Sequence, residues 1–164
     1  MPNKINKKTL FEIDLGGIMS VKILYGTETG NSEALAVQAS EAMKAAGIEA
    51  DVLDMGNVSL NDLKGYDKAL FITSTWGDGD APGNAMDLLE ELKSEKTKCL
   101  SELNYAVFGI GESIYEHFCQ AAIDFDEAVF DLGAKRIESL EKSEEDNEEN
   151  LKNWIEKIIP KLKS

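Results

Sequence analysis

Cysteine, histidine and long apolar runs are all scarce in this chain. Its 164 residues include two cysteines and one histidine, and no segment approaches the roughly 20 consecutive apolar residues that a membrane-spanning helix requires. Cys99 and Cys119 lack the C-x-x-C spacing, which favours two reduced thiols in a cytoplasmic protein over a disulfide. His117 has no cysteine or carboxylate at a metal-ligand spacing. We therefore expect a cytoplasmic protein without a membrane segment or a metal site.

Positive charge is scarce as well. Lys and Arg number 17 against 31 Asp and Glu, which gives a formal net charge of −14. Nucleic acids are bound mainly by neutralising their phosphates with Lys and Arg, and anionic membrane surfaces also attract basic proteins, so both are excluded as partners. An acidic surface favours association with basic-surfaced proteins.

The first residues lack the features of a secretory signal. Residues 1–19 include Lys4, Lys7 and Lys8 but no continuous apolar core and no small-residue cleavage site. We interpret them as an N-terminal extension, for which two alternatives stay open: a poorly ordered segment or a docking arm. Residues 20–164 have the length of one domain with a substantial core, and we expect a monomer.

Apolar runs alternate with helical patterns along this domain, as in a parallel sheet covered by helices on both faces. Residues 69–72 and 105–108 are continuous apolar runs, which are typical of central strands, whereas residues 48–52 alternate and indicate an edge strand. Strands are also expected at residues 21–25 and at Ile137, and helices over residues 31–46, 84–93, 118–132 and 145–162, with Trp154 in the core. The fold class is α/β: a doubly wound three-layer sandwich with a five-stranded parallel sheet in the order 2-1-3-4-5.

A loop rich in glycine, hydroxyl and amide groups, residues 26–32, follows the first strand and precedes a helix. Backbone N–H groups and the helix dipole converge at such a junction and attract an anion. There is no Lys or Arg from Tyr25 to Met43, so the Walker pattern for nucleotide triphosphates is absent. The loop alone is as often a turn with a helix N-cap, but a single phosphate held by neutral donors fits it.

Two further loops follow the expected third and fourth strands. Residues 74–84 carry Trp76 and residues 109–119 carry Tyr115. In a 2-1-3-4-5 sheet the carboxyl ends of strands 1, 3 and 4 lie together, where ligands bind. Two aromatic side chains on facing loops can hold a planar ring between them.

These three loops resemble the flavin-binding loops of flavodoxins and of the FMN domains of diflavin reductases. The resemblance rests on Thr-Glu-Thr-Gly-Asn-Ser at 27–32, Ser-Thr-Trp-Gly-Asp-Gly at 74–79 and Gly-Ile-Gly-Glu-Ser-Ile-Tyr-Glu-His-Phe-Cys at 109–119. It runs from residue 21 to the C-terminus and implies a flavodoxin-like fold with FMN as cofactor. Residues 77–84 are closer to the diflavin-reductase version, whereas the absence of a long insertion in the last strand resembles short-chain flavodoxins.

The resemblance also implies the roles of individual residues. The FMN phosphate would be held by Thr27, Glu28, Thr29, Gly30, Asn31 and Ser32. The isoalloxazine ring would be surrounded by Ser74, Thr75, Trp76, Gly77, Asp78, Gly79, Gly109, Ile110, Gly111, Glu112, Tyr115, His117, Phe118 and Cys119. In the family a peptide that here is Gly77-Asp78 can flip when the flavin is reduced, and glycine permits the positive φ of such a flip.

The function implied is electron transfer rather than catalysis. Stacked aromatics and the acids Asp78, Asp80, Glu112 and Glu116 would disfavour the anionic, fully reduced ring. We expect a low-potential one-electron carrier that cycles non-covalently bound FMN between semiquinone and hydroquinone. Its partners would be a reductase as electron donor and an acceptor enzyme. The alternative is an accessory component dedicated to a single reductase or biosynthetic enzyme.

Two other classes share this strand order. A phospho-receiver domain needs acids after strand 1 and an Asp after strand 3, but Gly26-Thr27 and Ser74-Thr75 stand there. A flavodoxin-like NADPH-dependent reductase needs a second nucleotide site, for which no segment remains.

We expect Cys119 to pack beneath the ring and residues 144–149 to form a solvated helix start. Glu112 and Ile114 depart from the usual family residues, which affects the hydrogen bonds along that ring edge.

Overall fold

A computed structural model describes residues 20–76, 79–112 and 117–163; the expected extension over 1–19 lies outside these residues. Four parallel strands form most of the sheet: β1 (Val21–Gly26), β2 (Ala50–Asp54), β3 (Lys68–Ser74) and β4 (Asn104–Ile110). The strand order is β2-β1-β3-β4-β5. This confirms the doubly wound topology, with β2 at an edge as its alternating pattern predicted.

The last position of the sheet is shared by two short strands. β5 (Lys135–Arg136) pairs with the start of β4, and β6 (Glu141–Ser143) pairs with its end, both in parallel. The other edge of β4 is taken by β3 over seven residue pairs, so β5 and β6 lie on the same side of β4. Ile137, where one short strand was expected, follows β5 directly and donates its N–H to the Tyr105 carbonyl at 2.8 Å.

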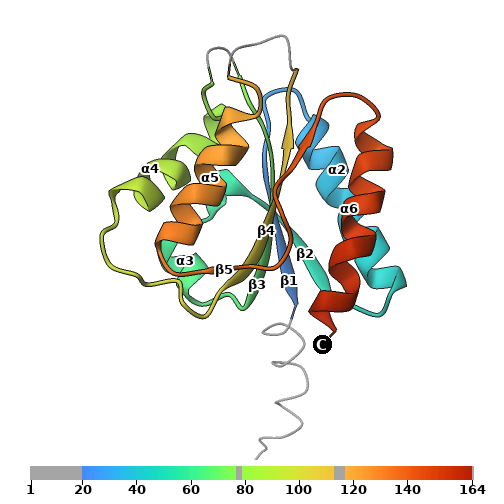
Figure 1. Cartoon of the computed structure of the whole chain (residues 1–164), viewed down its shortest axis with the longest axis horizontal. Coiled ribbons are helices and arrows are strands. Elements are labelled where there is room, and N and C mark those ends of the chain that lie inside the picture. Colours follow the sequence, from blue (N-terminus) through green and yellow to red (C-terminus); the bar gives the residue numbers. More distant parts are fainter. Residues whose placement is uncertain (1–19, 77–78, 113–116, 164) are drawn as a thin grey trace, which may run out of the picture.

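Helices cover both faces of the sheet (Figure 1). One face carries α3 (Leu60–Lys64), α4 (Met86–Ser94) and α5 (Gln120–Asp131), and the other carries α2 (Asn31–Ala45) and α6 (Asn147–Leu162). Each face of the sheet has its own hydrophobic core. Along β4, Tyr105 and Val107 belong to the core under α3, α4 and α5, whereas Ala106 and Phe108 belong to the core under α2 and α6. Because both faces are buried, the central strands need apolar residues at successive positions, as their sequences predicted. None of the described helices is both long and apolar enough to cross a membrane.

Several boundaries differ from those expected. β2 begins two residues later than predicted, α5 begins at Gln120 rather than Phe118, and α6 begins at Asn147 rather than Glu145. Three short elements were not predicted, namely the 3₁₀ helix at Met55–Asn57, α3 and β6. Helix α3 is five residues long and is stabilised by a capping box between Ser59 and Asp62. A helix this short leaves too little sequence for a periodic pattern.

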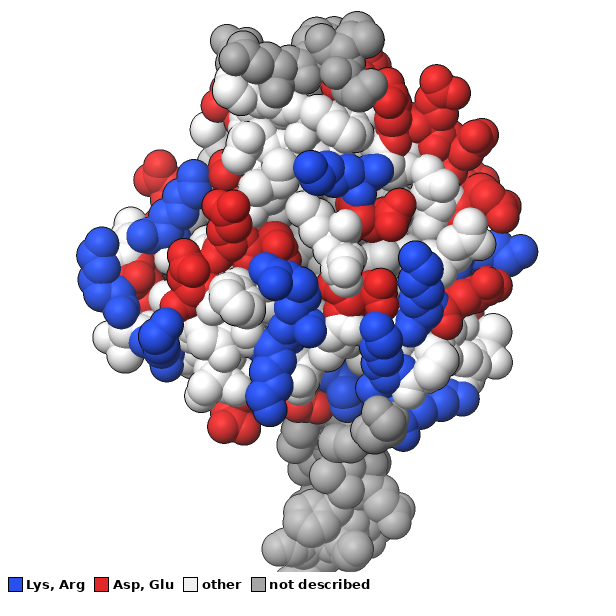
Figure 2. Space-filling view, viewed as in Figure 1, with Lys and Arg blue, Asp and Glu red and all other residues white. Residues whose placement is uncertain are grey.

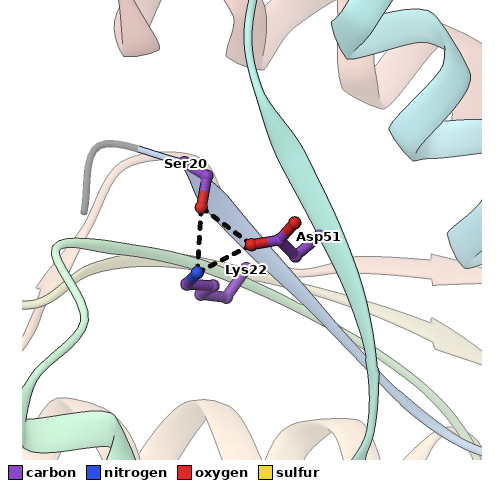
Figure 3. A network of polar contacts seen from close by, with 3 residues as sticks. All are labelled: Ser20, Lys22 and Asp51. Atoms are coloured by element: carbon purple, nitrogen blue, oxygen red, sulfur yellow. Dashed lines mark hydrogen bonds and ion pairs between the residues drawn. The ribbon is translucent and has the colours of Figure 1, made fainter. Parts of the chain in front are cut away.

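A polar network joins β1 and β2 at their amino ends (Figure 3). Lys22 lies opposite Asp51 in the strand register, and its ammonium donates to the Asp51 carboxylate at 2.8 Å and to the Ser20 hydroxyl at 2.9 Å. The Ser20 hydroxyl donates in turn to the same carboxylate at 2.9 Å. The bond from Lys22 lowers the pKa of Asp51 below its usual value. This network therefore supports the β1–β2 register at the end of the sheet opposite the three loops.

Candidate functional site

The loops that follow β1, β3 and β4 lie together at the carboxyl end of the sheet, at the top of Figure 1. They surround a pocket of about 590 Å³, which we call the site pocket. Its lining consists of Glu28, Thr29, Asn31, Ser74, Thr75, Trp76, Ile110, Gly111, Glu112, His117, Cys119, Glu144 and Asn147. The three loops therefore meet as the topology predicted.

The first loop ends in an open helix N-terminus. Gly30, the residue before α2, has φ +94° and, as a glycine, no side chain to cap the helix. Ser32, in the first turn, is fully buried, and its hydroxyl has no hydrogen-bond partner among the residues that the structure describes. A buried hydroxyl without a partner is costly, and here it stands where the helix dipole favours a negative charge. These features fit a bound anion.

Other groups of the first loop are already bonded within the protein. The Gly30 N–H donates to the Thr27 hydroxyl oxygen at 2.8 Å, and the Thr27 N–H donates to the side-chain oxygen of Asn84 at 2.8 Å. The Glu28 carboxylate accepts the Gly83 N–H at 2.7 Å. The backbone N–H groups of Thr27 and Gly30 are therefore engaged within the protein, whereas the Thr27 hydroxyl only accepts here and keeps its own hydrogen as a donor.

The second loop presents Trp76 at the rim of the site pocket. The Trp76 side chain is 52% exposed, although its backbone is fixed in an antiparallel bridge with Asp80 through hydrogen bonds of 2.7 and 2.8 Å. The neighbouring Thr75 hydroxyl accepts the Ala121 N–H at 3.0 Å and so caps the first turn of α5. The main-chain bonds of Trp76 thus hold its side chain at the rim, where about half of the side chain is exposed to solvent.

The third loop is packed tightly against α5. A Cβ atom at Gly109 would lie 2.5 Å from Cβ of Ala122, so only glycine allows the helix to approach β4 this closely. Gly79, from the second loop, packs against His117, which is exposed. The second and third loops are therefore in direct contact along one side of the site pocket.

Cys119 lines the site pocket but is fully buried, so it behaves as a small apolar side chain, and its place beneath a ring remains a prediction. Both cysteines are free thiols, in agreement with the sequence. Burial raises the pKa of the Cys119 thiol to about 11, so roughly one molecule in a thousand carries a thiolate at pH 8. Because the thiolate is the reactive form, this thiol should be inert in the folded protein.

We predict that Ellman's reagent at pH 8 modifies one thiol per folded chain, the half-buried Cys99, and both thiols in denaturant. Cys99→Ser should abolish the reaction of the folded protein, and the matched variant Cys119→Ser should leave it unchanged. Rapid modification of two thiols in the native wild-type chain would contradict this prediction.

The turn between β6 and α6 closes the site pocket on a side that the sequence did not predict. Glu144 and Asn147 line the pocket, and the Gly111 N–H donates to the Ser143 carbonyl at 3.0 Å. The fully buried Ser143 hydroxyl bonds the Asn147 and Asn150 side chains. The acidic run here was interpreted as a solvated helix start. Ser143, the one buried position beside it, carries no pattern that would indicate the contact with Gly111.

The structure divides the predicted site residues into three groups. Those that line the pocket are Glu28, Thr29, Asn31, Ser74, Thr75, Trp76, Ile110, Gly111, Glu112, His117 and Cys119. Those that belong to the same loops without lining it are Thr27, Gly30, Ser32, Gly79, Gly109 and Phe118. Gly77, Asp78 and Tyr115 lie outside the described residues, as do Ile114 and Glu116, so the roles predicted for them remain predictions.

Comparison with known proteins adds three findings. The model of the flavodoxin family matches residues 23–157. The flavoprotein alpha-component of NADPH sulfite reductase from Shewanella sp. (strain MR-7) is 35% identical over 150 residues, which are 92% of this chain and 25% of that protein. The chain thus spans about a quarter of the length of the curated relatives that it matches.

Solved structures match over nearly their whole length. The structure of oxidised flavodoxin 2 from Bacillus cereus is 28% identical and superposes with a TM-score of 0.77, covering 87% of this chain and 99% of its own. The flavodoxin of Streptococcus pneumoniae TIGR4 is 31% identical with a TM-score of 0.72, covering 86% and 98%. The match therefore includes most of this chain and almost all of each solved structure.

Proposed function

The chain belongs to the flavodoxin family, and from this premise we propose that it is a low-potential one-electron carrier that binds FMN without a covalent bond. A flavodoxin-type domain transfers electrons through FMN, which accepts and donates electrons singly when bound. Beyond family membership, we propose that the potential is low, and we propose which residues hold FMN and which kind of partner the chain meets.

The observation that carries the proposal is the Ser32 hydroxyl, which is buried in the first turn of α2 and has no partner within the described part of the chain. A phosphate would supply its missing partner, together with Thr29 and Asn31 at the pocket wall. Trp76 would contact the ring from the second loop, and Ile110, Gly111 and Cys119 would contact it from the third. The site pocket, at about 590 Å³, is within the range of cofactor-sized pockets.

Charge in the site pocket supports a low potential. Glu28, Glu112 and Glu144 line it, and no Lys or Arg is among the described residues of its lining. Two like charges 4 Å apart repel by about 1 kcal/mol in water and about 4 kcal/mol near a protein surface, and 1.4 kcal/mol corresponds to about 59 mV for one electron. The carboxylates would therefore disfavour the second one-electron reduction of FMN, which makes the ring anionic.

We expect a spectroelectrochemical titration of the FMN-loaded protein to resolve two separate one-electron couples. Glu112→Gln should raise the lower potential by on the order of 10–40 mV, because one pocket carboxylate is removed. The matched control Glu149→Gln changes an exposed residue of α6 that does not line the pocket and should change the potential less. Two couples that coincide would contradict the carrier mechanism.

Exposed acids extend the negative charge beyond the pocket. Glu144, Glu145, Asp146, Glu148 and Glu149 are all exposed, and Figure 2 shows acidic side chains gathered over the start of α6. Basic-surfaced donor and acceptor proteins would be attracted to this end of the molecule, with association rates that fall as salt increases. We propose that the chain meets them as a cytoplasmic monomer.

A second candidate is an FMN component dedicated to one reductase. It is favoured by the 35% identity to a segment of a protein named for NADPH and sulfite reduction. For both candidates we expect the isolated chain not to oxidise NADPH, because electrons would come from a separate donor. Comparable reduction rates with several unrelated reductases would favour the general carrier, and reduction by a single one would favour the dedicated component.

A further inference from the structure

We infer that Asn84 is a positioning residue. It holds the backbone of the phosphate loop, residues 26–32, in the conformation that binds a phosphomonoester. This inference rests on the proposed binding of FMN. Asn84 lies in the 3₁₀ helix Gly83–Ala85, 57 positions beyond Thr27, and does not line the site pocket. It would act on the ligand through the backbone of the phosphate loop.

The strand register shows what Asn84 replaces. The Val21 N–H donates to the Glu49 carbonyl at 2.9 Å, so alternate residues of β1, beginning with Val21, direct their peptide groups toward β2. The last register pair joins Tyr25 to Asp54, after which β2 turns into the 3₁₀ helix Met55–Asn57. The next N–H in that series, on Thr27, lies beyond the last register pair, so no residue of β2 stands opposite it.

The carboxamide of Asn84 forms hydrogen bonds with the Thr27 N–H and with the Tyr25 carbonyl. Its oxygen accepts the Thr27 N–H at 2.8 Å, and its nitrogen donates to the Tyr25 carbonyl at 3.3 Å. A carboxamide has the same donor and acceptor as a peptide unit, so the side chain continues the ladder by one step beyond the end of β2. The direction in which the chain leaves β1 for the phosphate loop is therefore determined by a residue of the second loop.

Asn84 is itself held in place. Its nitrogen also donates to the Asp54 carboxylate at 2.9 Å, which accepts the Gly56 N–H at 2.7 Å. The donors and the acceptor of the carboxamide are all engaged, so its rotation would break several bonds at once. The chain direction at Thr27 is thus tied to β2 as well as to the second loop.

Two more contacts join the second loop to the phosphate loop. The Gly83 N–H donates to the Glu28 carboxylate at 2.7 Å. A Cβ atom at Gly26 would lie 2.9 Å from Cβ of Ala85 and 2.8 Å from the Thr73 hydroxyl oxygen, so the backbone of β1 is packed closely against this segment. The start of the phosphate loop has little room to move while these contacts exist.

The consequence concerns selectivity for the phosphate. Donors of an anion site must converge on one point, and a displaced first residue would spread them apart. FMN and riboflavin share the ring and differ in the phosphate, so loss of Asn84 should weaken FMN binding and leave riboflavin binding nearly unchanged. A residue with a purely structural role would affect both flavins alike.

The test measures the dissociation constants of FMN and riboflavin for the apoprotein by fluorescence titration. Asn84→Ala should raise the ratio of the FMN constant to the riboflavin constant by about tenfold or more, as expected for loss of one to two hydrogen bonds. Asn84→Ser keeps the position polar and perturbs folding less, and it should shift the ratio in the same direction. Riboflavin binding by each variant also shows that its pocket is folded.

The matched control is Asn104→Ala, whose carboxamide donates to the Asp67 carbonyl at 3.2 Å. Asn104 begins β4, so it lies at the opposite end of the sheet from the loops, and its replacement should leave the ratio unchanged. Equal losses for both flavins, or no change in Asn84→Ala and Asn84→Ser, would overturn the inference. A wild-type chain that binds neither flavin would instead overturn the proposed function.

Discussion

Replacement of Trp76 with alanine is expected to weaken FMN binding by about 10- to 100-fold, because stacking of a planar base-like ring on an aromatic side chain contributes about 1–3 kcal/mol. The free energy of unfolding of the apoprotein should change by less than about 0.5 kcal/mol. The Trp76 side chain is 52% exposed, and the turn that carries it is held by main-chain bonds to Asp80. The substitution removes a ring contact without opening the core.

Titration of the apoprotein with FMN, followed by flavin fluorescence, measures the loss of affinity, and urea unfolding measures the stability. Trp76→Phe keeps an aromatic face and should recover most of the affinity. An unchanged FMN dissociation constant in Trp76→Ala would show that this side chain does not contact the ring. A large loss of stability would show instead that the turn depends on the indole.

The other tryptophan should behave in the opposite way. Trp154→Ala is expected to lower the free energy of unfolding by about 3–5 kcal/mol, which is a large share of the 5–15 kcal/mol typical of a domain. Trp154 is 1% exposed and packs against Phe108 with ring centroids 5.3 Å apart. Its removal would leave a cavity between α6 and the sheet, far more costly than the loss of a surface ring.

Urea unfolding of the apoprotein, monitored by circular dichroism, tests this expectation. Trp154→Phe retains much of the volume, and the indole N–H has no hydrogen-bond partner among the described residues, so this variant should lose less stability than Trp154→Ala. A loss below about 1 kcal/mol in Trp154→Ala would contradict the assignment of this residue to the core.

The strands and the long helices were predictable because each has a local pattern. The continuous apolar runs of β3 and β4 indicated burial on both faces, and the alternation before Asp54 indicated an edge, as found. The apolar spacing of α6 indicated that Trp154 is buried, also as found. Three elements escaped prediction for the same physical reason: α3, β6 and the 3₁₀ helix Met55–Asn57 span five, three and three residues, too few for a period to be recognised.

The sequence predicted which loops form the site pocket but did not predict all the residues that line it. Strand order places the ends of β1, β3 and β4 together, so glycine-rich and aromatic residues after these strands were expected at one pocket. That Glu144 and Asn147 also line the pocket was not predictable, because an acidic run at a helix start is usually solvated. Their placement depends on the pairing of β6 with the end of β4.

The sequence alone was sufficient for the fold class, the strand order, the position of the pocket and the family resemblance, because periodicity and loop motifs are local properties of the chain. Tertiary structure was needed for the polar contacts between loops. Asn84 bonds Thr27, and Glu28 bonds Gly83, across 57 and 55 positions of the chain. The Asn84 bond forms where β2 ends one step before β1, and a strand end of that kind is determined by packing and leaves no periodic pattern in the residues.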